Sequence, residues 1–254
     1  PHVPFLAPDK YFDLYPFDRI TYQPDRPNLW DFLPPSAISK RYEAFGFELA
    51  KENHALRKEY MQAYHACVSF IDAQLGLVID SLKKQGLWDD TIIIFTSDHG
   101  YHLGDHFIWG KVTLFDVGAK VPFIVRAPGL SKSGTASEAM VELIDVYPTL
   151  ADLAELKAPN HLQGISLRPL LGHPDRLGKR KYAYSVVTRG PKNLGYALRN
   201  QNWRYGKWPD GEELYNLRTD PQEKHNLAQK NHLKERLQDF REILVEKQNL
   251  FEKN

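Results

Sequence analysis

The stretch that decides the fold is Thr91-Ile92-Ile93-Ile94-Phe95-Thr96, which is followed directly by Ser97-Asp98-His99-Gly100. A continuous run of β-branched and aromatic residues is typical of a central strand that is covered on both faces. Ligands of open α/β sheets gather at the carboxyl ends of strands, and Gly100 allows a sharp exit from the strand. These residues therefore predict a buried strand that ends in a functional loop.

The segments on either side of this strand continue an α/β pattern. Apolar residues recur at three- and four-residue steps from about Asn53 to Gln85, which predicts a long amphipathic helix that Gly86 closes. Residues 121–125 form a second β-branched run, and residues 138–153 have a helical pattern. This order of elements indicates an α/β fold with a mainly parallel sheet flanked by helices. The first 40 residues contain too many prolines for a long regular element.

The character of the sequence changes after about Lys179. Short aromatic segments separated by turn residues predict a small antiparallel sheet, with strands at residues 182–188, 196–199, 203–207 and 213–216. Residues 231–246 then predict a closing amphipathic helix. We therefore divide the chain into an α/β part over residues 1–178 and a small antiparallel α+β subdomain over residues 179–254.

The bulk composition is that of an ordinary globular protein. Hydrophobic residues make up 42% of the 254 residues and the formal net charge is +1, so the charge does not favour binding to nucleic acid or to a membrane surface. No apolar run reaches the length expected of a membrane span. Cys67 is the only cysteine, which excludes an intramolecular disulfide, and its apolar neighbours predict a core position.

The loop after the isoleucine strand gathers side chains that can bind a cation or an anion. Asp98 and His99 can both face a metal ion, although the same two residues could simply cap backbone amides in a turn. A lysine beside a cation can hold an ester oxygen as a point charge, whereas an isolated lysine is usually solvated. Further candidates follow within the same loop at His102, Asp105, His106 and Lys111.

Several motifs, in matching order, resemble the sulfatase family. Three stretches resemble the metal and sulfate loop of this family: Thr96-Ser97-Asp98-His99-Gly100, Leu103-Gly104-Asp105-His106 and Trp109-Gly110-Lys111. The resemblance extends to Pro1-His2-Val3-Pro4-Phe5, to residues 121–129, 142–150 and 164–171, and to the C-terminal Glu213-Leu214-Tyr215-Asn216-Leu217. The Asp-His-Gly sequence is most similar to the iduronate-2-sulfatase branch, and the choline-sulfatase branch has a similar loop.

This resemblance implies an alkaline phosphatase-like fold and hydrolysis of a sulfate ester, on a sulfated uronic acid or a related sulfated carbohydrate. It also implies a divalent cation, usually calcium in the family, with Asp98 and His99 as two of its ligands. Lys111 would hold a sulfate oxygen, and His2 would contact the sulfate or protonate the leaving alcohol. We further expect the sugar to be contacted by Tyr101, His102 and Trp109.

The nucleophile of such sulfatases is a formylglycine made within a Cys/Ser-x-Pro/Ala-x-Arg motif, and residues 1–254 contain no such motif. The beginning at Pro1 reads like the middle of a protein. We therefore expect a C-terminal portion that is inactive alone, that partners an N-terminal sulfatase segment, and that is exported to the periplasm, lysosome or exterior. Two alternatives stay open: a phosphate or phosphonate ester hydrolase of the same superfamily, and a non-catalytic binding module.

Overall fold

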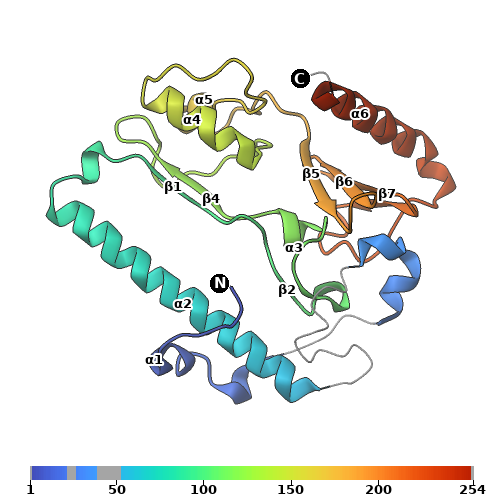
Figure 1. Ribbon diagram of the computed structural model, residues 1–254, viewed down its shortest axis with the longest axis horizontal. Coiled ribbons are helices and arrows are strands. Elements are labelled where there is room, and N and C mark those ends of the chain that lie inside the picture. The colour runs from blue at the N-terminus through green and yellow to red at the C-terminus, as the bar shows by residue number, and fades with distance from the viewer. Residues whose placement is uncertain (1, 22–26, 39–52, 253–254) are drawn as a thin grey trace.

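The computed structural model describes residues 2–21, 27–38 and 53–252, and Figure 1 shows how its elements are arranged. The proline-rich N-terminal region forms only short elements, as predicted. They are the helix α1 (Asp9–Phe12) and the 3-10 turns Phe17–Arg19, Pro27–Phe32 and Pro35–Ala37. Proline lacks a backbone N–H and has a fixed φ, so each of these turns ends within a few residues.

Helix α2 (His54–Lys84) is the long helix that the sequence predicts. The side chain of Asn53 caps its start, because Oδ1 accepts a hydrogen bond of 3.0 Å from the Leu56 amide. Gly86 closes its end with a φ of 70°, which glycine adopts without strain. Cys67 is 7% exposed on this helix, which confirms its core position, and burial raises the pKa of its thiol.

Helix α2 is also long and apolar enough to cross a membrane, which differs from the expectation drawn from the sequence. This is weak evidence for a membrane span, because the core helices of soluble proteins pass the same test. Only 11% of the most apolar 18-residue stretch of α2 is buried within the described chain. Side chains such as Ile71 and Val78 are 56% and 59% exposed, so one apolar side of α2 has no cover from the described residues.

Strands β1 (Ile93–Thr96) and β4 (Phe123–Arg126) form a two-stranded sheet and pair antiparallel, so this pair is not one of the parallel pairs expected of a mainly parallel sheet. Thr96 lies opposite Phe123, which means that the loop between the strands leaves and re-enters the sheet at the same end. A parallel pair would require a crossover to the opposite end. Neither strand contains a buried residue, so the described chain does not supply the predicted cover on both faces.

The loop between β1 and β4 is itself folded. It contains β2 (His102–Leu103), which pairs antiparallel with β3 (Trp109–Gly110), and the short helix α3 (Asp116–Ala119). Three of its non-glycine residues have positive φ, at His106 (55°), Phe107 (58°) and Val112 (68°). L-residues rarely adopt this conformation, so tertiary contacts must hold the loop in shape.

After β4 the chain forms α4 (Val146–Leu153) and α5 (Arg168–Gly172). The predicted helix over residues 138–153 therefore begins later than expected. A 3-10 turn at Leu143–Asp145 precedes α4, and Asp145 Oδ2 accepts a hydrogen bond of 2.8 Å from the Glu142 amide. Asp145 is fully buried and also pairs with Arg180 at 2.5 Å, and residues 138–142 have no regular secondary structure.

The C-terminal part matches its prediction closely. Its strands form one antiparallel sheet in the order β5 (Ala183–Thr188), β6 (Leu194–Arg199), β7 (Trp203–Trp208) and β8 (Gly211–Asn216). Helix α6 (Lys234–Glu252) covers one face of this sheet. The core between them contains Leu198, Tyr205, Leu214, Leu237, Phe240 and Leu244.

The opposite face of this sheet packs on the loop between β1 and β4. One cluster joins Trp208 and Ala197 to Leu114, and a second joins Tyr215 to Ile108 and Phe115. The C-terminal sheet therefore supports the very loop that carries the predicted site. The boundary between residues 178 and 179 remains a prediction.

Candidate active site

Asp98 and His99 lie where β1 ends, and the structure brings their side chains together. His99 Nε2 is 3.5 Å from Asp98 Oδ2, and the two side chains are 31% and 84% exposed. His99 Nδ1 lies 2.9 Å from the Gly100 carbonyl oxygen, which can only accept a hydrogen bond. In the neutral imidazole, Nδ1 therefore carries the proton and Nε2 is the nitrogen that can bind a metal ion. Metal-binding histidines typically show this arrangement.

Lys111 follows β3 directly, on the same loop as Asp98 and His99. His102 lies opposite Gly110, so Tyr101 and Lys111 leave the two-stranded ladder side by side. Tyr101 is two residues beyond His99. Lys111 is half-buried and Val112 after it has positive φ, so the backbone turns sharply beyond the lysine.

The N-terminal segment packs beside the same loop through Phe5. The Phe5 ring lies 4.8 Å from Tyr60, 5.5 Å from Tyr64 and 5.8 Å from Tyr101, measured between ring centroids. Tyr60 and Tyr101 also share a short hydrogen bond between their hydroxyl groups. His2 is exposed three residues before Phe5, and its Nδ1 lies 2.8 Å from the Val3 carbonyl oxygen. Pro1 lies outside the described residues.

Two of the predicted substrate contacts are buried in this structure. His102 has no exposed surface; its Nε2 lies 2.7 Å from Thr113 Oγ1 and its Nδ1 lies 3.0 Å from the Asp105 carbonyl oxygen. Trp109 is 5% exposed and packs edge-on against Tyr60. Both side chains therefore hold the loop together instead of facing a ligand. Tyr101 keeps partial exposure and remains the candidate for a substrate contact.

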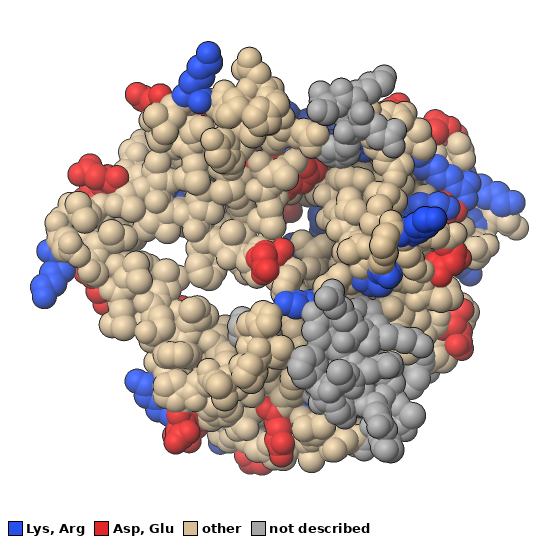
Figure 2. Space-filling view, in the orientation of Figure 1, with Lys and Arg blue, Asp and Glu red and all other residues tan. Residues whose placement is uncertain are grey.

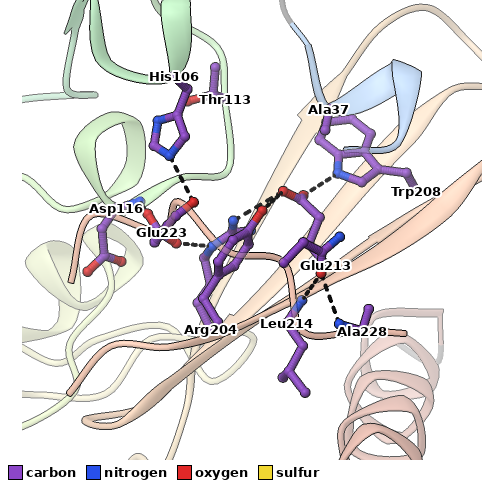
Figure 3. A network of polar contacts seen from close by, with 12 residues as sticks. Ala37, His106, Thr113, Asp116, Arg204, Trp208, Glu213, Leu214, Glu223 and Ala228 are labelled. Atoms are coloured by element: carbon purple, nitrogen blue, oxygen red, sulfur yellow. Dashed lines mark hydrogen bonds and ion pairs between the residues drawn. The ribbon is translucent and has the colours of Figure 1, made fainter. Parts of the chain in front are cut away.

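The structure also shows a buried polar network that the sequence analysis missed (Figure 3). Arg204 on β7 pairs with Glu213 on β8 and with Glu223 in the following loop, and all three are 2% exposed or less. Burial raises the pKa of Glu223, and the neighbouring Arg204 guanidinium opposes that shift only in part. Glu213 begins a C-terminal motif, but the sequence alone gave no sign that these three side chains meet in a buried network.

A metal ion would find only part of its ligand set among these residues. Asp98 offers carboxylate oxygens and His99 offers Nε2, and the described part of the chain has no group of three His, Cys, Asp or Glu side chains arranged for a metal. Calcium takes six to eight oxygen ligands. Asp98 and His99 therefore supply only part of the ligand set that such an ion requires.

The loop that follows β1 carries Asp98, His99 and Lys111. Similarity to known proteins shows the family to which the chain belongs. Residues 1–156 match the family model described as Sulfatase, and residues 104–250 match the one described as N-sulphoglucosamine sulphohydrolase, C-terminal. The chain belongs to the sulfatase family, whose solved members have the alkaline phosphatase-like fold.

Individual relatives agree with this assignment. A sulfatase of Formosa agariphila is 34% identical over 96% of this chain and 47% of its own length. The iduronate 2-sulfatase of Homo sapiens is 30% identical over 89% of this chain and 56% of its own length. The phosphonate monoester hydrolase of Silicibacter pomeroyi superposes with a TM-score of 0.84 at 28% identity, over 98% of this chain and 54% of that structure. The chain thus spans about half the length of the relatives that it matches.

Proposed function

We propose that these 254 residues form the C-terminal part of a sulfuric ester hydrolase that acts on a sulfated carbohydrate, of the iduronate-2-sulfatase type. One observation carries the proposal: the Asp98–His99 pair, with Nε2 turned to the carboxylate, stands at the end of β1, and Lys111 leaves the adjoining ladder beside Tyr101. A carboxylate, an imidazole and an ammonium in one loop suit a cation and an anionic ester together.

Each group then has a distinct role. Asp98 and His99 would hold part of the shell of a divalent cation, calcium by family resemblance, which polarises the ester oxygens. The Lys111 ammonium would hold one sulfate oxygen as a fixed positive charge before the reaction begins. His2 stands three residues before Phe5, which packs on Tyr101, and its imidazole would donate a proton to the leaving alcohol.

The nucleophile in this proposal is a formylglycine supplied from outside residues 1–254, within an N-terminal sulfatase segment. Large apolar side chains support such a partner, because they remain exposed on three neighbouring elements. Val78 of α2 is 59% exposed, Ile124 of β4 is 61% exposed and Tyr147 of α4 is 59% exposed. Figure 2 shows openings through the molecule between α2 and the β1–β4 pair. Large apolar side chains that are exposed on several elements suit an interface with another segment.

A second candidate function is phosphonate monoester hydrolysis, which the likeness to the Silicibacter pomeroyi enzyme favours. The same loop could hold a phosphonate ester, because both substrates present anionic oxygens to a cation and a lysine.

The test compares the two ester classes on two proteins. The purified chain should not hydrolyse 4-nitrophenyl sulfate, because it contains no formylglycine motif. The polypeptide joined to an N-terminal sulfatase segment should hydrolyse 4-nitrophenyl sulfate and a 2-sulfated uronate. If hydrolytic activity co-purifies with the chain alone, the proposal that residues 1–254 lack the nucleophile is refuted. A complete enzyme that prefers phenyl phosphonate esters would replace the sulfatase proposal with the second candidate.

A further inference from the structure

One residue of the C-terminal subdomain, Glu223, holds both arms of the predicted site loop. Its carbonyl oxygen accepts a hydrogen bond of 3.1 Å from His106 Nε2, and its Oε2 accepts one of 2.6 Å from the Asp116 amide. Lys111 lies five residues after His106 and five residues before Asp116. Glu223 therefore holds both ends of the turn that contains Lys111, one through its backbone carbonyl and the other through its carboxylate. Figure 3 shows Glu223 beside His106 and Asp116.

The Asp116 contact also reaches the Asp98–His99 pair. Asp116 begins α3, and the carbonyl oxygen of Gly118 in that helix accepts a hydrogen bond of 2.9 Å from the Gly100 amide. Gly100 directly follows His99, and a Cβ atom on it would lie 2.0 Å from the Val117 carbonyl oxygen. The approach is so close that a shift of α3 must also move the end of the Asp98–His99 segment.

Glu223 is itself held in place by the four-stranded sheet. Its Oε1 accepts a short hydrogen bond from Arg204 Nε, and the Arg204 guanidinium lies 4.8 Å from the Phe115 ring centroid and 4.6 Å from that of Tyr215. Glu223 is 2% exposed and has a φ of 55°, an uncommon conformation for glutamate. A strained, buried carboxylate with donors on two sides points to a positioning role.

We propose that Glu223 is a positioning residue that fixes the loop carrying Asp98, His99 and Lys111 onto the C-terminal sheet. This inference rests on the proposed function for the identity of the site. Its geometric content, which is the coupling of the sheet to residues 97–118, does not depend on the reaction.

Glu213 provides a matched control for Glu223. Both are buried carboxylates that accept a hydrogen bond from Arg204. The other partners of Glu213 are Trp208 Nε1 at 2.8 Å and the Tyr215 hydroxyl at 3.0 Å, both within the sheet. Glu223→Gln and Glu213→Gln each replace a carboxylate with two acceptor oxygens by an amide with one. Only Glu223 binds a residue of the site loop, so only its substitution removes a contact to that loop.

The experiment measures backbone amide hydrogen exchange on the purified chain and on both variants. Glu223→Gln should speed exchange at Gly100 and Asp116 by about tenfold or more relative to the amides of β6 and β7. Glu213→Gln should leave that ratio unchanged. Glu223→Asp keeps two carboxylate acceptors, so it should give an intermediate ratio, and it carries the test if Glu223→Gln does not fold. An unchanged ratio in the Glu223 variants, or an equal rise in Glu213→Gln, would overturn the proposal.

A kinetic measurement on the complete enzyme separates this inference from the proposed function. Glu223→Gln should lower kcat by on the order of a hundredfold, since a small misplacement of the reacting groups has that effect. Glu213→Gln should lower it far less. If the unmodified enzyme hydrolyses no sulfate ester, the proposed function fails. The exchange ratio still tests whether Glu223 fixes the loop onto the C-terminal sheet. A loosened loop with a normal kcat would overturn the positioning role.

Discussion

Replacing Gly100 by alanine tests how tightly the site loop packs on α3. The added Cβ would lie 2.0 Å from the Val117 carbonyl oxygen, and real Cβ contacts essentially never fall below 3.0 Å. The loop and the helix must therefore separate by about 1 Å, which lengthens the 2.9 Å hydrogen bond from Gly100 N to Gly118 O past a useful distance. Overpacking costs about 1–3 kcal/mol and the lost hydrogen bond about 1 kcal/mol.

The expected result for Gly100→Ala is a loss of roughly 2–4 kcal/mol in the free energy of unfolding, which corresponds to a Tm lower by roughly 5–15 °C. Gly76→Ala is the matched control, because Gly76 lies within α2 and has no atom within 4 Å of the added Cβ. Alanine favours a helix over glycine by about 0.8–1 kcal/mol, so this variant should be more stable than the parent chain.

Urea and thermal unfolding of the two variants give the test, since the same chemical change should shift stability in opposite directions. If the Gly100→Ala chain has the same Tm as the unmodified protein, the loop can move away from α3 at no cost in stability. That result would refute the tight coupling between α3 and the Asp98–His99 pair on which the positioning role of Glu223 depends.

Three further results are expected. In the complete enzyme, Lys111→Ala should lower kcat/KM by on the order of a hundredfold with little change in Tm, and Lys111→Arg should restore only part of the loss; near-normal steady-state kinetics would place Lys111 outside the site. The hydrogen bond from Arg241 lowers the pKa of Glu212 from 4.5 to about 2, so the unfolded chain binds more protons in this window and stability falls as the pH drops from 4.5 to 2. Glu212→Gln should flatten that part of a pH series of urea unfolding curves, and an unchanged slope would contradict the assignment. The buried Cys67 thiol, whose pKa burial raises, should react slowly with a thiol reagent in the native chain and rapidly in urea.

Local patterns predicted the elements that depend on near neighbours. The periodicity from Asn53 to Gln85 and the cap residues at its ends predicted α2 almost to the residue. The alternation of aromatic and turn residues after Lys179 predicted the four strands β5–β8. Caps, turns and hydrophobic periods act over a few residues, so the sequence alone displays them.

Long-range pairing could not be predicted in the same way. The isoleucine run of β1 predicted a strand correctly but not its partner, because a strand's composition does not state the direction of its neighbour. The same run predicted burial on both faces, whereas Phe95 is exposed in the described chain, as is Ile124 of β4. Burial depends on which segments meet a strand, and the composition of the strand does not specify them.

The order and spacing of residues after a strand form a local motif, and this motif was enough to indicate the family and the candidates Asp98, His99 and Lys111. Only the tertiary structure separated these groups from His102 and Trp109, which share the loop but are buried in its packing. It alone revealed Glu223, which lies 107 residues from the amide that it binds. Burial and contacts between distant segments exist only after the chain has folded, since they depend on which surfaces meet.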